Sequence, residues 1–518
     1  MFKAIESRIW LLPTVAFICA FFIRSYLVVV SSVITPDGIL YIKSAQLFEI
    51  GEWNKVSDLF FINLYPFFIL LFHKIIPDWE IAGRMVSVIM GSLTAIPFFL
   101  MIKGMFDVRT AMVSSLFYII NPRLADYSAD VLREPTFWFF SVTALWLAWE
   151  GISRVSLIWI IFSSFSTGLA IFTRIEGVSV FVLIILWIIW HFWKIKPNTK
   201  KLFLFLFVFV FTIPVLLSPF LLILKYKLGR WEFSHAMIKI PALLMNVNAD
   251  ALEMPPNLIQ TMPLKLSIFL ELAKSHKYVI FFSDILLKLV KSANIVFIFF
   301  AIIGVIRKRK LNDYKNEVLV AIWFGVFFII AFAYITKVYY FSTRHGLLMG
   351  IPVLIWAGIG FFEIKEWIYL WFKRTRHPGF LVKNVTTILI IAILIAIMPK
   401  TLSPGGYDKI EMKKAGTYFK NMGYKGIIFT GEPGLQRIAF YADSEFSPLP
   451  VVETTEELMK FMRENKTELL IFDKNTSNSI YKNIQSKIDD SVFEQVSLPE
   501  FEKYREYKIL AYRLKNKL

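Results

Sequence analysis

An acidic stretch follows the first long apolar run of the chain: Ile34-Thr35-Pro36-Asp37-Gly38-Ile39-Leu40-Tyr41-Ile42. A carboxylate at this place lies just outside the hydrocarbon of a membrane, where it stays ionised and still meets a lipid-borne substrate. An Asp followed by Gly is equally typical of a simple turn beyond a membrane helix. We interpret Asp37 as a candidate catalytic base, around which the apolar remainder of the chain builds a cavity.

The composition is that of a membrane protein. Of 518 residues, 57% are hydrophobic, and the mean hydropathy is +0.59, too apolar for an ordinary soluble enzyme. In a soluble protein the net charge of +18 would suggest nucleic acid. Here the basic residues gather in short loops between apolar runs, which favours a role in membrane orientation, and no nucleic-acid partner is expected. The single cysteine, Cys19, excludes disulfides within the chain and Cys-rich metal sites.

Eleven apolar runs predict a polytopic α-helical membrane protein. Several are shorter than the roughly 20 residues of a full crossing, so their ends are approximate. No small-residue cleavage site follows the first run, which we therefore expect to be retained as a span. The runs cover residues 9–30, 81–102, 108–121, 135–150, 156–173, 177–193, 202–224, 292–306, 317–336, 346–363 and 384–399.

The basic loops predict the orientation of these spans. If Lys3 and Arg8 are cytoplasmic, every strongly basic short loop falls on the cytoplasmic side, as the positive-inside rule requires. These loops contain Lys103 and Arg109, Arg154, Lys194–Lys201, Arg307–Lys310, and Lys373-Arg374. The count requires that two short apolar segments, 64–76 and 266–290, do not cross. We expect both to be helices that lie along the outer face of the cell membrane.

The outer side then carries the loops 31–80, 121–134 and 225–291 and the turns at 173–177 and 337–345. After Ser403-Pro404-Gly405-Gly406, the composition becomes that of a soluble domain. We predict a membrane domain over 1–402 and a small extracytoplasmic α/β domain over 403–518. Its expected strands lie at 425–430, 469–472 and 508–512, with a helix at 455–464.

Three more carboxylates lie in the second outer loop. Asp126, Asp130 and Glu134 are spaced four apart, which would place them along one face of a helical segment. Pro135 suits the first position of the next span and leaves Glu134 beside unpaired backbone N–H groups. A solvated acidic face accounts for Asp126, but less well for Glu134, which lies at the membrane boundary.

The turn Thr173-Arg174-Ile175-Glu176-Gly177 places opposite charges between two apolar runs. Such charges are costly there unless they are paired or face a polar cavity. We expect a structural ion pair for Glu176, whereas Arg174 can form that pair and also face the cavity.

Cations and aromatic residues gather before the span at 346–363: Lys337, Tyr340, Arg344 and His345. They suit the anchoring of helices at a membrane interface. They equally suit a lipid-linked phosphate or diphosphate, because arginine offers two donors in a fork that matches phosphate oxygens. A histidine such as His345 is more often a structural partner than a catalyst.

Several short motifs occur in a definite order along the chain. They are Pro36-Asp37-Gly38-x-x-Tyr41, Gly83-Arg84, Asn121-Pro122, Arg133-Glu134-Pro135, Thr173-Arg174-x-Glu176-Gly177 and Arg344-His345. Over roughly residues 1–400 this order resembles the GT-C glycosyltransferases. The resemblance is to the group containing the dolichyl-phosphate-mannose protein mannosyltransferases and the bacterial aminoarabinose transferase that acts on lipid A.

The resemblance implies an inverting enzyme that moves a sugar from a polyprenyl phosphate to an acceptor glycan, lipid or protein on the outer face. It implies that Asp37 deprotonates the acceptor and that Glu134 orients acceptor or donor. Arg344 and Lys337 are the candidates for holding the phosphate, with Arg174 as a further candidate. The remaining candidates for the substrate cavity are Tyr41, Asp130, Glu176, Tyr340 and His345.

Two departures from the family pattern bear on the expected acceptor and on the expected need for a metal ion. Many protein mannosyltransferases carry Glu directly after the first-loop Asp, where this chain has Gly38, which argues against a protein acceptor. The first loop has no Asp-x-Asp pair, which argues against a metal-dependent oligosaccharyltransferase. We expect an enzyme with no metal and no cofactor, whose partners are the lipid-linked sugar, its acceptor and membrane lipids.

Two other functions stay open from the sequence. A polytopic transporter or lipid flippase often shows inverted repeats and broken helices with polar residues at the membrane midplane, whereas the polar candidates here gather at the outer ends of spans. A membrane scaffold for an envelope complex would use the outer domain as its binding part. Release of polyprenyl phosphate that depends on an acceptor separates an enzyme from both.

Exhaustive chelation with EDTA should leave the transfer activity of the purified protein unchanged, because fixed cations of the chain are expected to match the phosphate charge. The measurement is the rate of polyprenyl-phosphate release before and after dialysis against the chelator. Activity that disappears and returns with a divalent ion would show that this expectation is wrong.

Overall fold

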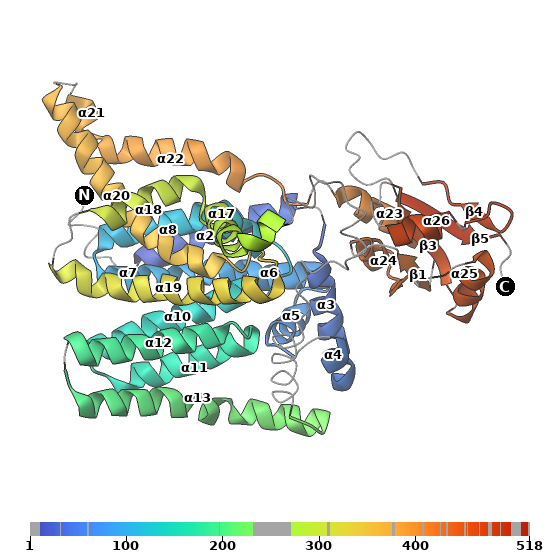
Figure 1. Ribbon diagram of the computed structural model, residues 1–518, viewed down its shortest axis with the longest axis horizontal. Coiled ribbons are helices and arrows are strands. Elements are labelled where there is room, and N and C mark those ends of the chain that lie inside the picture. Colours follow the sequence, from blue (N-terminus) through green and yellow to red (C-terminus); the bar gives the residue numbers. More distant parts are fainter. Residues whose placement is uncertain are drawn as a thin grey trace.

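Long apolar helices run side by side to form a bundle, and a small mixed β-sheet lies beyond one end of it (Figure 1). The computed structural model describes residues 11–515, with gaps at 32, 60–61, 196, 232–270, 308–310, 376–378, 407–408, 425, 431–433, 450–451, 453, 466, 475–478, 487 and 499–508. Within these residues, each of the expected apolar runs is helical, apart from a break at Asn294 inside the run 292–306.

The bundle helices are α2 (Leu11–Val30), α6 (Trp79–Leu93), α7 (Ala95–Met105), α8 (Val108–Ile120), α10 (Glu134–Ser153), α11 (Leu157–Thr173), α12 (Gly177–Trp190), α13 (Thr199–Leu228), α17 (Lys277–Ala293), α18 (Ile295–Ile306), α19 (Leu311–Val338), α20 (Leu347–Arg374) and α22 (Val385–Thr401). A π-helical turn, η1 (His191–Ile195), continues α12, and the short α21 (Gly379–Lys383) precedes α22.

By length and apolarity, six helical stretches of the described chain can cross a membrane. They are α2, the continuous α6–α7, α12 with η1, α13, α19 and α20. A seventh crossing results if α17 and α18, which are bent by 105° at Asn294, form one broken span. The protein is thus a multi-pass membrane protein, and the count of eleven crossings stays a prediction, since α8, α11 and α22 are apolar but shorter.

Two basic connections lie at the end of the bundle far from the sheet (Figure 1). One joins α12 to α13 and contains the Lys194–Lys201 cluster, and the other joins α20 to α21 after Lys373-Arg374. Lys3, Arg8 and residues 308–310, which the orientation argument also used, lie outside the described residues.

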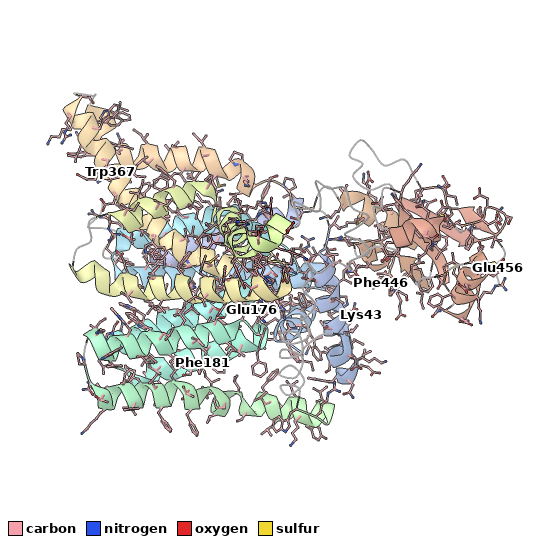
Figure 2. All side chains as sticks on the ribbon, viewed as in Figure 1. Lys43, Glu176, Phe181, Trp367, Phe446 and Glu456 are labelled. Atoms are coloured by element: carbon pink, nitrogen blue, oxygen red, sulfur yellow. The ribbon has the colours of Figure 1, made fainter. Side chains whose placement is uncertain are left out.

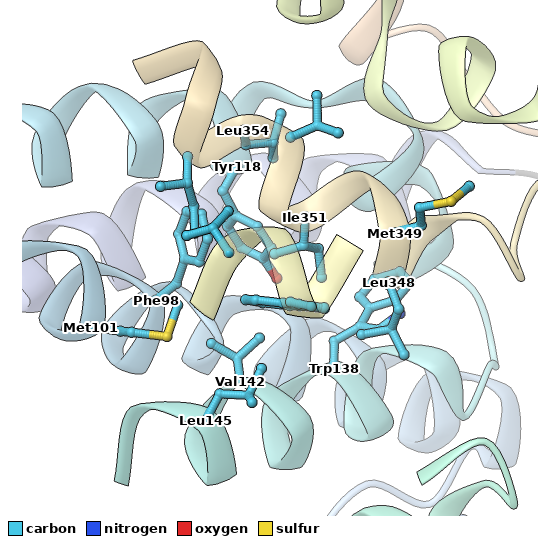
Figure 3. Packing of buried hydrophobic residues seen from close by; sticks show 14 of the residues in the cluster. Phe98, Met101, Tyr118, Trp138, Val142, Leu145, Leu348, Met349, Ile351 and Leu354 are labelled. Atoms are coloured by element: carbon cyan, nitrogen blue, oxygen red, sulfur yellow. The ribbon is translucent and has the colours of Figure 1, made fainter. Parts of the chain in front are cut away.

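Large side chains from four helices fill the centre of the bundle (Figure 3). Phe98 of α7, Tyr118 of α8 and Trp138 of α10 are almost completely buried, and Ile351 of α20 packs among them. The Tyr118 hydroxyl donates to the Gly91 carbonyl at 2.6 Å, so its polar atom is satisfied inside this apolar core. This core fixes the helix ends from which the candidate site is built.

The segment 31–80 is more regular than the expected wet loop. It forms α3 (Pro36–Glu49), α4 (Trp53–Leu59) and α5 (Tyr65–His73), the last of which matches the helix predicted at 64–76. Pro36 occupies the first turn of α3, and Thr35 caps it by accepting from the Gly38 N–H at 3.3 Å. Asp37 therefore lies in the first turn of a helix, because proline and the threonine cap start one here.

The expectation of three carboxylates on one helical face is wrong. The helix α9 (Pro122–Ser128) ends before Asp130, and α10 starts anew at Glu134. Pro135 lies in the first turn of α10, where its missing N–H costs no hydrogen bond, which favours this new start. Asp126 consequently pairs with Arg123 at 3.6 Å, while Asp130 and Glu134 point to other partners. Most of the predicted loop 225–291 lies outside the described residues, and α17 covers its described end.

The C-terminal sheet has the strand order β2-β1-β3-β5-β4. Its strands are β1 (Ile427–Thr430), β2 (Glu445–Pro448), β3 (Thr467–Asp473), β4 (Phe493–Gln495) and β5 (Ile509–Leu514). The pairs β1–β2 and β1–β3 are parallel, and β3–β5 and β4–β5 are antiparallel. The helices are α23 (Ile410–Asn421), α24 (Gln436–Tyr441), α25 (Thr455–Glu464) and α26 (Ser479–Gln485).

The strands predicted around residues 425, 469 and 508 correspond to β1, β3 and β5, and the predicted helix at 455–464 is α25. The strands β2 and β4 were not predicted, because they are only four and three residues long and mostly exposed. Such edge strands lack the alternating apolar pattern by which a strand is identified.

The crossing of α18 and α20 depends on two glycines. A Cβ at Gly360 would lie 2.7 Å from the Gly304 nitrogen and closer still to the Phe300 carbonyl. We expect Gly360→Ala to cost about 1–3 kcal/mol through overpacking, because backbone on both sides must move. The thermal unfolding midpoint in detergent measures this loss.

Gly325→Ala is the matched control, since a Cβ there meets nothing within 4 Å. It should leave stability unchanged or raise it by up to about 1 kcal/mol, the difference in helix propensity between the two residues. Equal midpoints for the two variants would contradict the packing argument.

Candidate active site

Five charged side chains of alternating sign meet where α3, α10, α12 and the turn before α20 come together; we call them the charge chain. They are Asp37, Arg344, Glu134, Arg174 and Glu176. Figure 2 labels Glu176 toward the end of the bundle nearest the C-terminal sheet, whereas Trp367 lies toward the opposite end. The charge chain is therefore at the sheet end of the bundle.

Arg344 connects the two carboxylates predicted to be catalytic. Its Nη1 forms an ion pair with Asp37 Oδ2 and lies 3.8 Å from Glu134 Oε1. Asp37 and Arg344 are 36% and 32% exposed, so this end of the charge chain is open to solvent. One guanidinium thus lies within reach of both acids at an accessible position.

Arg174 lies at the buried end. It donates to Glu134 through Nη1 and to Glu176 through Nη2 at 2.5 Å and Nε at 3.2 Å. Glu134 is only 2% exposed and Arg174 6%, so these ions gain little from water and depend on each other. Burial alone would raise the pKa of Glu176, but the neighbouring Arg174 guanidinium outweighs burial and holds that pKa well below its usual range.

A cavity of about 100 Å³ opens beside the charge chain. Its lining residues are Glu134, Phe137, Trp138, Arg174, Glu176, Ser179, Phe327, Ile330, Ala331, Tyr334, Phe341, Arg344, His345 and Leu348. Two buried atoms on its wall, Glu134 Oε2 and His345 Nδ1, have no hydrogen-bond partner among the described residues. A polar ligand in the cavity can therefore form hydrogen bonds with a carboxylate oxygen and an imidazole nitrogen, between apolar walls.

His345 is held neutral at ordinary pH. Burial, together with the positive charges of Arg174 and Arg344, lowers its pKa to about 4. The imidazole also lies edge-on to the ring of Tyr334, with centroids 5.6 Å apart. It can accept or donate a hydrogen bond in the cavity, but it adds no positive charge for a phosphate.

Of the other predicted site residues, Tyr41 and Asp130 lie near the charge chain but outside the cavity wall. Tyr41 is 4% exposed, packs edge-on against Tyr65 and has the Arg133 guanidinium over its ring at 5.8 Å. Asp130 accepts from the Val131 N–H at 2.7 Å and is close to Arg84, and burial raises its pKa. Both residues support the walls of the site.

Lys337 and Tyr340 are exposed near the end of α19 and do not line the cavity. The sequence placed them beside Arg344 only through their closeness along the chain. Tyr334, one helical turn before Lys337, does line the cavity, and no sequence signal singled it out. An aromatic residue within an apolar run has the pattern of a core residue, so its role depends on the three-dimensional arrangement.

No group of three or more His, Cys, Asp or Glu side chains that could hold a metal ion occurs among the residues that the structure describes. The two carboxylates that line the cavity, Glu134 and Glu176, instead pair with Arg174. Independence from metal stays a prediction.

The chain is similar to known glycosyltransferases in part of its sequence and in its fold. Residues 63–217 match the family model described as dolichyl-phosphate-mannose-protein mannosyltransferase. Among solved structures, ArnT from Cupriavidus metallidurans bound to undecaprenyl phosphate superposes with a TM-score of 0.56 at 12% identity, covering 98% of both chains. The chain shares the fold of this transferase.

The chain is also similar in fold to an archaeal enzyme. The oligosaccharyltransferase of Archaeoglobus fulgidus gives a TM-score of 0.56 at 11% identity, over 92% of this chain and 71% of that one. The same oligosaccharyltransferase, AglB, in complex with an inhibitory peptide and a dolichol-phosphate, gives 0.55 at 12% identity with the same coverage. None of the curated proteins matches the chain.

The family match covers only part of the charge chain. Glu134, Arg174 and Glu176 fall within residues 63–217, whereas Asp37 and Arg344 lie outside that segment. The fold brings the two outer members of the charge chain to the three inner ones.

The depressed pKa of His345 predicts an acid-sensitive fold. Below pH about 6.5 the unfolded chain binds a proton at this histidine that the folded protein does not bind until pH about 4. Stability should therefore fall as the pH decreases across this window, by at most about 1.4 kcal/mol per pH unit from this group. His345→Gln should flatten the dependence of the unfolding midpoint on pH.

His276→Gln serves as the control, because that imidazole is exposed and far from the cavity wall. It should keep the pH dependence of the unaltered protein. The same slope in His345→Gln as in the unaltered protein would refute the neutral state of His345.

Proposed function

We propose that this chain is an inverting transferase that moves a sugar from a polyprenyl phosphate to an acceptor hydroxyl at the sheet end of the bundle. The observation that carries the proposal is the position of Arg344, which contacts Asp37 and Glu134 together beside an apolar-walled cavity. The ArnT structure that resembles this chain was solved with undecaprenyl phosphate, and AglB with dolichol-phosphate, which supports a lipid phosphate as donor.

Donor binding requires a partner exchange at Arg344. Its guanidinium is engaged by Asp37 in the structure, and a phosphate presents stronger, doubly bonding oxygens. When the donor phosphate takes over this guanidinium, Asp37 is released to accept a proton. We assign Arg344 as the main phosphate ligand, Arg174 as a buried electrostatic support, and Lys337 as a peripheral cation near the same turn.

The chemical step is a displacement at the anomeric carbon. The acceptor oxygen forms a bond to that carbon while the bond from carbon to phosphate oxygen breaks, and the acceptor proton passes to Asp37. The electron pair leaves with polyprenyl phosphate, whose charge is matched by Arg344. Attack from the face opposite the leaving group inverts the anomeric configuration.

Glu134 is assigned the role of orienting a substrate hydroxyl. One of its oxygens is held by Arg174, and the buried Oε2 has no partner among the described residues and faces the cavity wall. Together with His345 Nδ1, it offers hydrogen bonds to a sugar in the cavity. Glu176 keeps Arg174 in place, and Tyr41 with Asp130 supports the wall behind Asp37. Tyr340 remains a candidate at the cavity mouth.

Gly38 has a packing reason for being glycine. A Cβ there would lie 2.8 Å from Ile34 Cγ1 and 2.9 Å from Val131 Cβ, so an acidic residue does not fit. The acceptor thus meets a single carboxylate in this turn. The acceptor class, whether glycan, lipid or protein, is the open part of the assignment.

We also propose the membrane topology that the basic connections predict. Eleven crossings with a cytoplasmic N-terminus would put the basic connections after α12 and α20 inside and the charge chain outside. Residues 1–402 would form the transferase domain in the cell membrane, with residues 403–518 as an extracytoplasmic domain. The separation between basic connections and charge chain along the bundle supports this orientation.

Asp37→Asn should lower turnover by at least about a hundredfold, because general base catalysis is typically worth about 10²–10⁴-fold. The assay follows polyprenyl phosphate released from a polyprenyl-phosphate sugar in the presence of acceptor, with donor affinity measured in parallel. Asp58→Asn, at a carboxylate that is 74% exposed, is the matched control and should keep full turnover. Near-normal turnover in Asp37→Asn would remove Asp37 from the mechanism.

Arg344→Lys should weaken donor binding by roughly ten- to hundredfold, because a lysine keeps the charge but cannot bond two phosphate oxygens in a fork. The affinity for polyprenyl phosphate alone, titrated into the purified protein, measures the effect. Arg123→Lys, which alters a half-exposed arginine outside the cavity wall, is the control. Unchanged affinity in Arg344→Lys would reject Arg344 as phosphate ligand.

A further inference from the structure

We propose that Arg437 and Tyr441, on α24 of the C-terminal sheet domain, are positioning residues that hold the Asp37 turn in its reactive place. The inference rests on the proposed role of Asp37 as the base. It assigns to the C-terminal domain an indirect part in catalysis: the domain positions Asp37 by holding the backbone just before α3.

Both backbone groups of one residue are bound by α24. Arg437 Nε donates to the Ile34 carbonyl at 2.7 Å, and the Ile34 N–H donates to the Tyr441 hydroxyl at 2.9 Å. Ile34 is fully buried, and Arg437 is 7% exposed. Since these bonds hold the two peptide units on either side of the Ile34 Cα, they fix the orientation as well as the position of the chain.

The next residue is held from the membrane side. The Asp130 carboxylate lies near the backbone N–H of Thr35 and near the Arg84 guanidinium. Arg84 donates to the Ala129 carbonyl at 3.0 Å and pairs with Glu80 at 2.8 Å. Consecutive residues before Asp37 are therefore anchored to different parts of the molecule.

The two anchors join into a closed ring of contacts. The Tyr441 hydroxyl donates to Glu80 Oε1 at 3.3 Å, which is the oxygen that also binds Arg84. Contacts thus lead from Tyr441 to Ile34, along the backbone to Thr35, then through Asp130, Arg84 and Glu80 back to Tyr441. A ring of this kind resists displacement of any one member, because each is held from two sides.

If the Ile34 backbone shifts, Asp37 is expected to shift with it. Thr35 caps α3 and Pro36 has a fixed φ angle, so little torsional freedom separates the anchored backbone from the Asp37 side chain. A shift of about 1 Å at a reacting group can cost about a hundredfold in rate. Loss of an α24 contact should therefore lower turnover without touching the phosphate ligand Arg344.

The test is Tyr441→Phe, which removes one oxygen and keeps the ring. It should lower kcat by roughly tenfold or more while the KM for the polyprenyl-phosphate sugar changes by less than about twofold. Tyr418→Phe is the matched control, because that hydroxyl bonds the Ser497 carbonyl within the same domain and should leave kcat unchanged. Equal kcat values for Tyr441→Phe and the unaltered protein would overturn the proposal.

Arg437→Lys and Arg437→Met extend the test. Lysine retains one donor for the Ile34 carbonyl and should keep more activity than methionine, which has none. If Arg437→Met fails to fold, the Tyr441→Phe comparison still decides. Equal activity of folded Lys and Met variants would count against positioning through this bond.

A double-mutant cycle separates positioning from general support of the fold. A residue that acts through Asp37 should have no further effect once Asp37 is asparagine, so Tyr441→Phe should leave the residual rate of Asp37→Asn unchanged. The same fold-loss in both backgrounds would reject the positioning role and leave the base assignment intact. Near-normal turnover of Asp37→Asn alone would reject the base assignment, and this inference with it.

Discussion

A carboxylate between two guanidiniums is the interaction on which the site depends. Glu134 is almost completely buried at the start of α10, and its Oε1 is bonded to Arg174 and lies 3.8 Å from Arg344 Nη1. Removing one partner of such a buried group typically costs about 3–5 kcal/mol, because a charge is left without compensation. The loops that supply the arginines are therefore tied to α10, and the cavity takes its shape from them.

The helical architecture could largely be predicted, because apolar runs and their basic connections are local signals. Asp37, Glu134 and Arg344 could also be singled out, since charges at the ends of apolar helices are conspicuous. The break between Asp130 and Glu134 was missed, because a spacing of four residues suggests a continuous helix. Pro135, correctly expected at a helix start, already argued against that continuity.

What the sequence could not supply are contacts between distant segments of the chain. The pairing of Asp37 with Arg344 spans 307 residues, and the contact of Ile34 with Arg437 spans 403. Arg437 lies in a six-residue helix with no motif, and Tyr334 lies in an apolar run, so neither carries a local signal. Their neighbours become known only when the helices are packed.

The bent pair α17 and α18 has a bearing on how the protein is made. Asn294, at the 105° bend, lies next to Ala293 and Ser292, whose carbonyls accept from the Asn121 side chain at the end of α8. The bend is thus stabilised by a residue synthesised more than a hundred positions earlier. During biogenesis the bend can therefore gain these two hydrogen bonds only once α17, made later, has packed against the end of α8.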